Sequence, residues 1–205
     1  MTQAAQPTLF LLAGPNGAGK STLYVDRIKP MTQAPLINAD EILRSWQAHG
    51  TDHTDAYAAS REAAAQRAQL IEARRSFVTE TVFSHPSKIE LVEAALAAGY
   101  RVVLYHVNVR LPNISVARVA ARVATGGHPV AEDKIRQRYE RNRTLIRRAA
   151  EQASVTHVFD NSKRGQPPRW LLTLEHGVLV AQSQGDCPEW AEVLYLRRFI
   201  RVRED

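Results

Sequence analysis

Several features are scarce in this 205-residue chain, and each absence narrows the class of protein. Its single cysteine, Cys187, has no partner for an internal disulfide, so we expect a reducing compartment such as the cytoplasm. No apolar run approaches the roughly 20 residues that span a bilayer, and no basic segment precedes Leu9. We therefore expect neither a membrane span nor a signal peptide.

Internal repeats and low-complexity tracts are also absent. Hydrophobic residues make up 44% of the chain and charged residues 23%, which is typical of a globular protein with a real core. We expect one domain over residues 1–205, with an arginine-rich flap at about 113–140 and a C-terminal hairpin appendage at about 168–205.

The net charge of +6 is concentrated in one stretch. Between Asn113 and Gln152, eight arginines and Lys134 stand against four acidic residues. Such clustering indicates an anionic partner, namely a nucleotide, a phosphorylated metabolite or nucleic acid, and the alternative is a solvated helix face. Tyr139 is the one aromatic residue of this stretch that could stack on a base, which disfavours nucleic acid.

Apolar runs alternate with helical patterns along the chain. Strands are predicted at 9–13, 35–38, 76–80, 100–109 and 155–160. Helices are predicted at 20–28, from residue 40, and at 54–75, 86–98, 114–124 and 131–153, the fourth with a capping box of Ser87 and Glu90 and a stop at Gly99. The alternation predicts an α/β fold, a mostly parallel sheet flanked by helices, and residues 170–182 alternate around His176-Gly177 as a hairpin does.

The most specific motif is "GPNGAGKS", which fits the phosphate-loop pattern G-x-x-x-x-G-K-[ST] between a strand and a helix. Small residues let backbone N–H groups surround a phosphate, and the following helix presents its N-terminus to the same anion. Lys20 would bridge the β- and γ-phosphates of ATP, and the Ser21 hydroxyl would bind Mg²⁺. The residues expected to bind the nucleotide here are Gly14, Pro15, Asn16, Gly17, Ala18, Gly19, Lys20, Ser21 and Thr22.

Acidic residues follow two of the predicted strands, where ligands of a parallel sheet gather. Asp40 and Glu41 come after the second strand, and both are candidates to bind the substrate. Asp40 is also our candidate for the base that accepts the proton of an attacking hydroxyl. A helix cap is the alternative role for Asp40. Glu80, with Thr81 beside it, would hold substrate hydroxyls or order water around Mg²⁺, unless it is simply an exposed glutamate at a strand end.

Arginines of the flap are candidates to neutralise charge on the transferring phosphoryl group. Arg118 and Arg122 are four residues apart, hence on one helix face, and Arg136 and Arg138 open the next helix. "GGHPV" supplies a hinge with His128. We expect a surface role for some of the later arginines. Asn161, after the last parallel strand, would contact the adenine or act as a turn residue.

In these elements the chain resembles the zeta toxin family, specifically its shorter single-domain members. The resemblance rests on "AGPNGAGKST", "NADEI", "FVTETVFS", "GYRVVLYHVNV", "RVATGGHPVAEDKIRQRYER" and "VFDNS", which together cover roughly Leu9 to Ser162. It implies a P-loop kinase fold, dependence on ATP and Mg²⁺, and phosphorylation of the 3′-hydroxyl of a UDP-activated amino sugar such as UDP-N-acetylglucosamine. Many members also pair with an antitoxin protein.

Carried over by position, the resemblance makes Asp40 the base, Lys20 the phosphate lysine and Glu80 a substrate contact. It places Arg122 and a residue near His128 on the flap. The larger toxins have a second arginine where His128 aligns.

Three other functions fit parts of the sequence. A kinase for another hydroxyl compound, such as a nucleoside, dinucleotide, sugar acid or antibiotic, is the nearest alternative. A polynucleotide-end kinase or nucleic-acid-binding protein would use the basic stretch. An assembly ATPase is disfavoured, because no apolar strand ends in a DExx signature.

Overall fold

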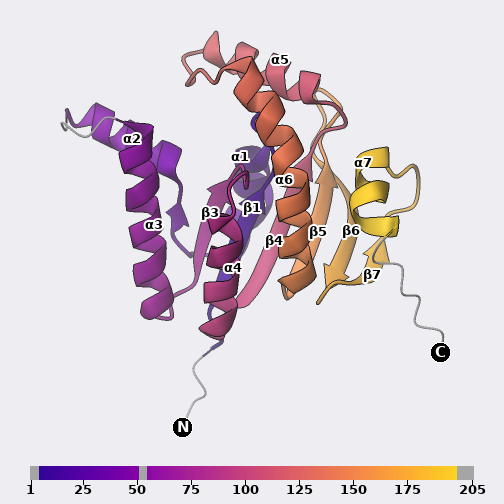
Figure 1. Ribbon diagram of the computed structural model, residues 1–205, viewed down its shortest axis with the longest axis horizontal. Coiled ribbons are helices and arrows are strands. Elements are labelled where there is room, and N and C mark those ends of the chain that lie inside the picture. Colours follow the sequence, from indigo (N-terminus) through magenta and orange to yellow (C-terminus); the bar gives the residue numbers. More distant parts are fainter. Residues whose placement is uncertain (1–4, 51–54, 198–205) are drawn as a thin grey trace.

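A mixed sheet of seven strands forms the centre of the structure, a computed structural model that describes residues 5–50 and 55–197 (Figure 1). The strand order is β2-β3-β1-β4-β5-β6-β7, parallel from β2 to β5 and antiparallel from β5 to β7. The strands are β1 (Thr8–Ala13), β2 (Leu36–Ile37), β3 (Phe77–Thr81), β4 (Arg101–Asn108), β5 (Val155–Asp160), β6 (Arg169–Glu175) and β7 (Val178–Gln182). The predicted α/β fold with a mainly parallel sheet is confirmed.

The helices fall close to their predicted positions. They are α1 (Lys20–Leu23), α2 (Ala39–Ala48), α3 (Ala56–Glu72), α4 (Ser87–Ala97), α5 (Pro112–Val123), α6 (Glu132–Gln152) and α7 (Glu189–Ala191). Two π-helical turns continue α1 and α7, at Tyr24–Ile28 and Glu192–Leu196, and a short 3-10 turn follows the first at Lys29–Met31. The helix predicted over 54–75 is α3, and Thr54 lies outside the described residues.

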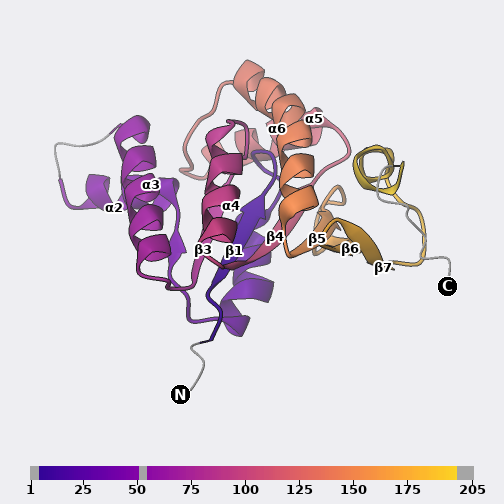
Figure 2. The same ribbon diagram turned by 60° about the horizontal axis from the view of Figure 1, so that its bottom comes forward.

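Helices cover both faces of the sheet: α3, α4 and α6 lie on one face and α1 on the other (Figures 1 and 2). Strand β4 shows how the sequence produces this arrangement. Val102 and Leu104 belong to the core under α4 and α6, whereas Val103 and Tyr105 belong to the core on the α1 side. A strand whose two faces are both buried has apolar residues at successive positions, as Val102 to Tyr105 are here, and lacks the regular alternation with polar residues.

All parallel strands end at the same edge of the sheet, the upper edge in Figure 1, where α5 also lies. The loops that follow β1, β2, β3, β4 and β5 therefore meet there. In open parallel sheets ligands bind in the crevice outside these carboxyl ends.

The predicted hairpin is present as β6 and β7, and it continues the central sheet because β6 pairs with β5. The segment after it packs back on the sheet: Trp190 Nε1 donates to Asp160 Oδ1 at 3.2 Å, and the Tyr195 hydroxyl lies 2.6 Å from Nδ1 of the buried His106. Residues 198–205 of the expected appendage lie outside the described residues. Within the part of the chain that the structure describes, no helix has the length and hydropathy needed to cross a membrane.

The capping box predicted for the helix after β3 is wrong. Helix α4 begins at Ser87, so the cap position is occupied by Pro86, which makes no side-chain hydrogen bond to the helix. The amide of Ser87 donates to Nδ1 of His85 at 3.2 Å. The turn before it has a sharp corner at Phe83, which has φ of 59° although it is not glycine. Thr81 Oγ1 accepts the Phe83 amide at 3.0 Å, and the ring is fully buried in the core. This corner sets the direction of the short segment that leads from β3 into α4.

Candidate active site

The phosphate loop has the backbone that its glycines predict. Gly14, directly after β1, has φ of 151°, and a Cβ there would meet the carbonyl oxygen of Val107. Gly19, just before α1, has φ of 93°, and a Cβ there would meet the side chain of Asn161. Both positions therefore require glycine, since neither the conformation nor the space admits a side chain. The loop is a concave backbone cradle closed by the N-terminus of a helix, the arrangement that binds phosphate.

Lys20 folds back over this loop. Its ammonium donates to the Pro15 carbonyl oxygen at 3.0 Å and lies 3.8 Å from Glu80 Oε1. The side chain is only 6% exposed, and burial lowers the pKa of Lys20 although Glu80 and Asp40 act against that shift. A buried cation at the mouth of a phosphate cradle stabilises an anion bound there more strongly than an exposed one would.

Ser21 and Glu80 form the candidate magnesium site. Strand β3 pairs with β1 so that Glu80 lies beside Leu12, at the edge from which the phosphate loop starts. The Ser21 hydroxyl donates to Glu80 Oε2 at 2.8 Å. Hydroxyl and carboxylate oxygens are hard ligands of the kind that Mg²⁺ prefers, and Mg²⁺ usually takes its other ligands from phosphates and water. The residues present therefore fit the ion, with Ser21 and Glu80 to hold it.

Asp40 does not cap the helix it opens. The N-cap of α2 is Asn38, whose Oδ1 accepts the amide of Asp40 at 2.9 Å. No hydrogen bond or ion pair joins the Asp40 carboxylate to another residue that the structure describes, and Asp40 lines the same cavity as Lys20. The negative charge of Asp40 raises the pKa of Lys20, against the lowering by burial. The alternative role as a cap is thus taken by another residue.

One cavity of about 740 Å³ opens at this edge of the sheet. It is lined by residues of the phosphate loop, by the start of α2, by α3 and by the turn from β3 to α4. Residues of α5, α6 and the loop after β5 complete it. Of the candidate site residues outside the phosphate loop, those in the lining are Asp40, Glu80, Thr81, Arg118, Arg122, Arg138 and Asn161.

The arginines of α5 approach the phosphate loop from the β4 side. Arg118 donates to the Gly17 carbonyl oxygen at 3.3 Å and to that of Lys163 at 3.4 Å. Burial lowers the pKa of Arg118. Arg122, one turn along the same face, acts on the pKa of Lys20 and donates to the His128 carbonyl oxygen at 3.2 Å. Both side chains line the cavity beside the phosphate loop, and their contact with phosphate stays a prediction.

Asn161 stabilises the phosphate loop directly. Its Nδ2 donates to the Ala18 carbonyl oxygen at 2.8 Å, and its amide donates to the Asn108 carbonyl oxygen at 2.8 Å. These bonds tie the end of β5 to β4 and to the loop. Contact with an adenine stays a prediction, and positioning of the loop is the role that the geometry supports.

Outside the phosphate loop, three predicted site residues are absent from the cavity lining: Glu41, His128 and Arg136. Within the loop, Gly14, Pro15 and Ala18 are absent from it too. Glu41 is exposed at the start of α2. Arg136 makes a two-pronged ion pair with Glu132, at 2.6 and 2.9 Å, and its side chain is 43% exposed. Their roles toward substrate stay predictions.

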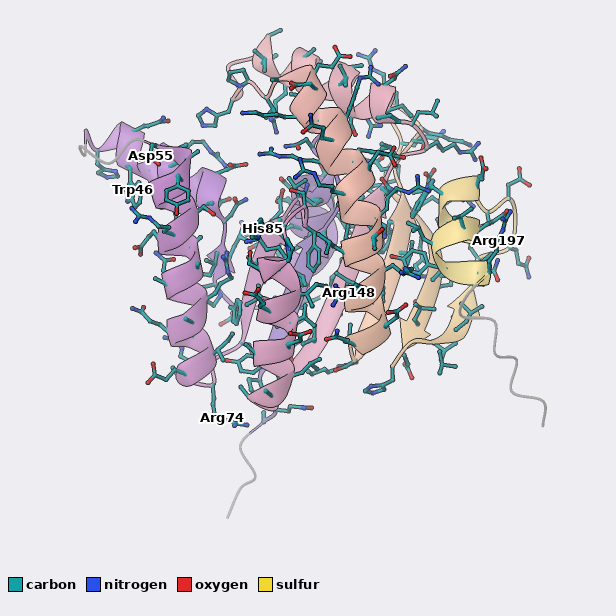
Figure 3. The ribbon with its side chains drawn as sticks, in the orientation of Figure 1. Trp46, Asp55, Arg74, His85, Arg148 and Arg197 are labelled. Carbon is teal, nitrogen blue, oxygen red and sulfur yellow. The ribbon has the colours of Figure 1, made fainter. Side chains whose placement is uncertain are left out.

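Of the later arginines of α6, Arg141 and Arg148 are exposed, whereas Arg143 and Arg147 are partly buried. Arg143 pairs with Glu140 and Arg147 with Glu151 within the helix, and Figure 3 places Arg148 on its lower half, away from α5. Much of the basic stretch is thus a solvated helix face paired with glutamates, which leaves little of it for nucleic acid.

Several lining residues were not predicted, among them Arg67 of α3, Lys88 of α4, and Lys163 and Arg164 after β5. A signal for Arg67 exists in the sequence: Ala59 and Ala63 are buried at four-residue spacing on α3, and the same spacing leads to Arg67. This spacing places Arg67 on the buried face of the helix, where an arginine is unusual. The other three carry no local pattern.

A phosphate cradle with a buried lysine, a hydroxyl–carboxylate pair that fits Mg²⁺ and an aspartate in the same cavity are features of the P-loop kinases, enzymes that transfer a phosphoryl group to an acceptor. The sequence model of the family described as zeta toxin matches residues 1–166, and the chain belongs to this family.

Known proteins similar to this chain agree with the fold. An uncharacterized protein of Haemophilus influenzae is 31% identical over 134 residues, 65% of this chain and 94% of that protein. A chain of the AvrRxo1-ORF1:AvrRxo1-ORF2 complex crystallised with ATP superposes with a TM-score of 0.63 at 18% identity, over 93% of this chain and 63% of that chain. A chain from the PezAT toxin–antitoxin system of Streptococcus pneumoniae superposes with a TM-score of 0.57 at 16% identity, over 98% of this chain and 81% of that chain. This chain thus spans less than two thirds of the AvrRxo1 chain.

Proposed function

We propose that the protein is a kinase that uses ATP and Mg²⁺ to phosphorylate a hydroxyl of a small molecule, with a UDP-activated amino sugar of the UDP-N-acetylglucosamine type as the first acceptor to test. The supporting observation is that Lys20 and the carboxylate of Asp40 line one cavity while Asn38 caps the helix. A phosphate loop alone also serves motors and switches. A carboxylate in the same cavity supplies the base that a hydroxyl acceptor needs.

In this reaction the acceptor oxygen attacks the γ-phosphorus of ATP, and its bond to phosphorus forms as the bond to the β–γ bridging oxygen breaks. ADP leaves, and the hydroxyl proton passes to the carboxylate of Asp40. Lys20 and Arg122 neutralise negative charge on the phosphoryl oxygens, which is the main contribution that a protein makes to such a transfer. Magnesium, when bound by Ser21 and phosphate oxygens, supplies further positive charge and orients the phosphates.

An acceptor screen tests the proposal. Purified protein with ATP and Mg²⁺ should release ADP faster with the true acceptor than with water, and mass spectrometry of the product should show one added phosphoryl group. The panel contains UDP-N-acetylglucosamine, nucleosides, dinucleotides, sugar acids and aminoglycoside antibiotics. If UDP-sugars match water while another compound turns over, the UDP-sugar assignment is wrong. If every acceptor matches water, the proposed phosphorylation of small molecules is wrong.

We also propose that the enzyme acts in the cytoplasm and that a protein partner restrains it. The similarity to a chain of the PezAT toxin–antitoxin system supports such a partner, and a reducing compartment rich in ATP suits one unpaired cysteine. Purification of the tagged protein from its own cells, with identification of bound proteins and comparison of ADP release before and after their removal, tests the partner. Equal ADP release in both samples would contradict a restraining partner.

A further inference from the structure

Two unpaired cations face the cavity from the side of α3 and α4. Arg67 is only 8% exposed, and its guanidinium has a single bond, a long one of 3.5 Å from Nη1 to Thr79 Oγ1. Lys88 is half-buried in the first turn of α4. Within residues 5–50 and 55–197, no carboxylate lies within ion-pair distance of either side chain, and the Lys88 ammonium has no hydrogen-bond partner.

Among the residues that the structure describes, no acidic side chain offsets the free-energy cost of burying these two charges. Arg67 and Lys88 line the same cavity. Burial lowers the pKa of Arg67, and burial together with the positive charge of Arg67 lowers the pKa of Lys88. A buried charge without a partner is strongly unfavourable. Lys88 also stands at the N-terminal end of a helix, where the macrodipole disfavours a cation. An anion bound between the two side chains would remove all three penalties.

The position of the pair in the sheet separates it from the nucleotide side. The phosphate loop follows the central strand β1. Arg118 and Lys163 approach it from β4 and β5, whereas Arg67 contacts Thr79 of β3, whose hydroxyl donates to the Ile37 carbonyl oxygen of β2. The cations Arg67 and Lys88 thus belong to the half of the cavity next to Asp40, where an acceptor would lie.

The carboxylates of the cavity do not neutralise this half. Asp40 and Glu80 are the acidic residues in its described lining. Glu80 is engaged by Ser21 and Lys20, and neither it nor Asp40 pairs with Arg67 or Lys88. Any compensating charge must therefore come with a ligand or from residues that the structure does not describe.

We propose that Arg67 and Lys88 bind an anionic group of the acceptor, a carboxylate or a phosphate, so that the substrate is a small hydroxylated acid or phosphate ester and not a neutral sugar or nucleoside. The acceptor role rests on the proposed kinase function. A charge-assisted bond to a planar guanidinium orients its partner as well as binding it. Anchoring the anion would turn the acceptor hydroxyl toward Asp40 and the γ-phosphate, which is the orientation that a transfer requires.

Matched ligands test the anion dependence. The protein is saturated with Mg²⁺ and a non-hydrolysable ATP analogue, and binding is measured by calorimetry for glucose, gluconate and glucose 6-phosphate, and for N-acetylglucosamine and its UDP ester. The same compounds are then assayed for turnover with ATP. We expect at least one anionic compound to bind about tenfold or more tightly than its neutral counterpart, and the comparison of gluconate with the two phosphate-bearing compounds shows which anion the site prefers.

Variants test the residues. Arg67→Gln and Lys88→Gln should each weaken binding of the preferred anion, and raise its KM, about tenfold or more, with little change for ATP or for neutral compounds. Arg61→Gln is the matched control, because it removes one positive charge from an exposed position of the same helix. Arg67→Met should keep or raise Tm, since an unpaired buried charge is lost, whereas a structural arginine would lower Tm on removal.

The outcomes separate the two proposals. Anion binding that depends on Arg67 and Lys88, without turnover of any acceptor, would refute the proposed kinase function and leave the anion site standing. If neutral and anionic acceptors turn over with equal KM, and those KM values are the same in Arg67→Gln, the anion site is refuted and the proposed kinase function stands. Absence of any preference for anions in the binding assay would also refute it.

Discussion

Asn38 and Asp40 stand two residues apart at the start of α2, and substitutions should separate a structural role from a chemical one. Asn38→Ala removes the oxygen that accepts the Asp40 amide at 2.9 Å, which should lower the free energy of unfolding by about 1 kcal/mol. That corresponds to a Tm about 2–4 °C lower for a domain of this size. Asp40→Asn keeps the shape and removes the charge, so it should lower kcat by about 10²–10⁴-fold, roughly 3–5 kcal/mol in the activation free energy.

The assay combines ADP release with calorimetry for the Mg²⁺ complex of an ATP analogue. ATP affinity of Asp40→Asn should stay within about twofold, and the unfolding free energy should change by less than about 1 kcal/mol, the contribution of an exposed acid near a helix N-terminus. Asp26→Asn is the control, because Asp26 is exposed and lies outside the cavity. An Asp40→Asn enzyme with most of its turnover would refute the assignment of the base. The assignment would also be refuted if Asn38→Ala lowered kcat as much as Asp40→Asn does while its Tm stayed at the wild-type value.

Three further predictions concern the loop, the metal and the core. Gly14→Ala should weaken ATP binding about tenfold or more in calorimetry and lower Tm, because both the φ of 151° and the neighbouring carbonyl exclude a Cβ; unchanged affinity would contradict the cradle. Glu80→Gln should raise the Mg²⁺ concentration needed for half-maximal turnover severalfold, and an unaltered requirement would remove Glu80 from the metal site that it shares with Ser21. Burial lowers the pKa of His106 to about 3, so the unfolded chain binds a proton below pH 6.5 that the folded chain does not. The unfolding free energy should therefore fall by about 1.4 kcal/mol per pH unit from about 6.5 toward 3. His106→Gln, which keeps a partner for Tyr195, should flatten that dependence in urea titrations, and equal slopes would contradict it.

The elements that carry local signals were predictable. The phosphate loop is defined by glycine positions that the backbone needs, and β4 by its β-branched and aromatic residues. The carboxyl ends of parallel strands share one edge, so the proximity of Asp40, Glu80 and Lys20 followed from strand order in the sequence. That inference needed no knowledge of side-chain contacts.

Residues positioned by tertiary packing were not predictable in the same way. Asn38 looked like the end of a strand, and its role as the cap of α2 depends on where the helix starts. Ser87 matched a capping pattern, but the corner at Phe83 placed His85 to accept the amide of Ser87 instead. Arg67 enters the cavity because α3 packs closely through small residues, and such a geometry leaves only a spacing in the sequence.

The corner at Phe83 has a consequence for how this enzyme can diversify. Its ring is locked in the core and its backbone is held by Thr81, while the next residues, Ser84, His85 and Lys88, face the cavity. The phosphate loop depends on a different strand and on Asn161. Because His85 also accepts the amide of Ser87 at the start of α4, substitutions at 84 and 88 are the ones that would change this wall of the cavity without altering the contacts of α4 or of the phosphate loop. Descendants of one ancestral enzyme could acquire new acceptors through a handful of neighbouring codons.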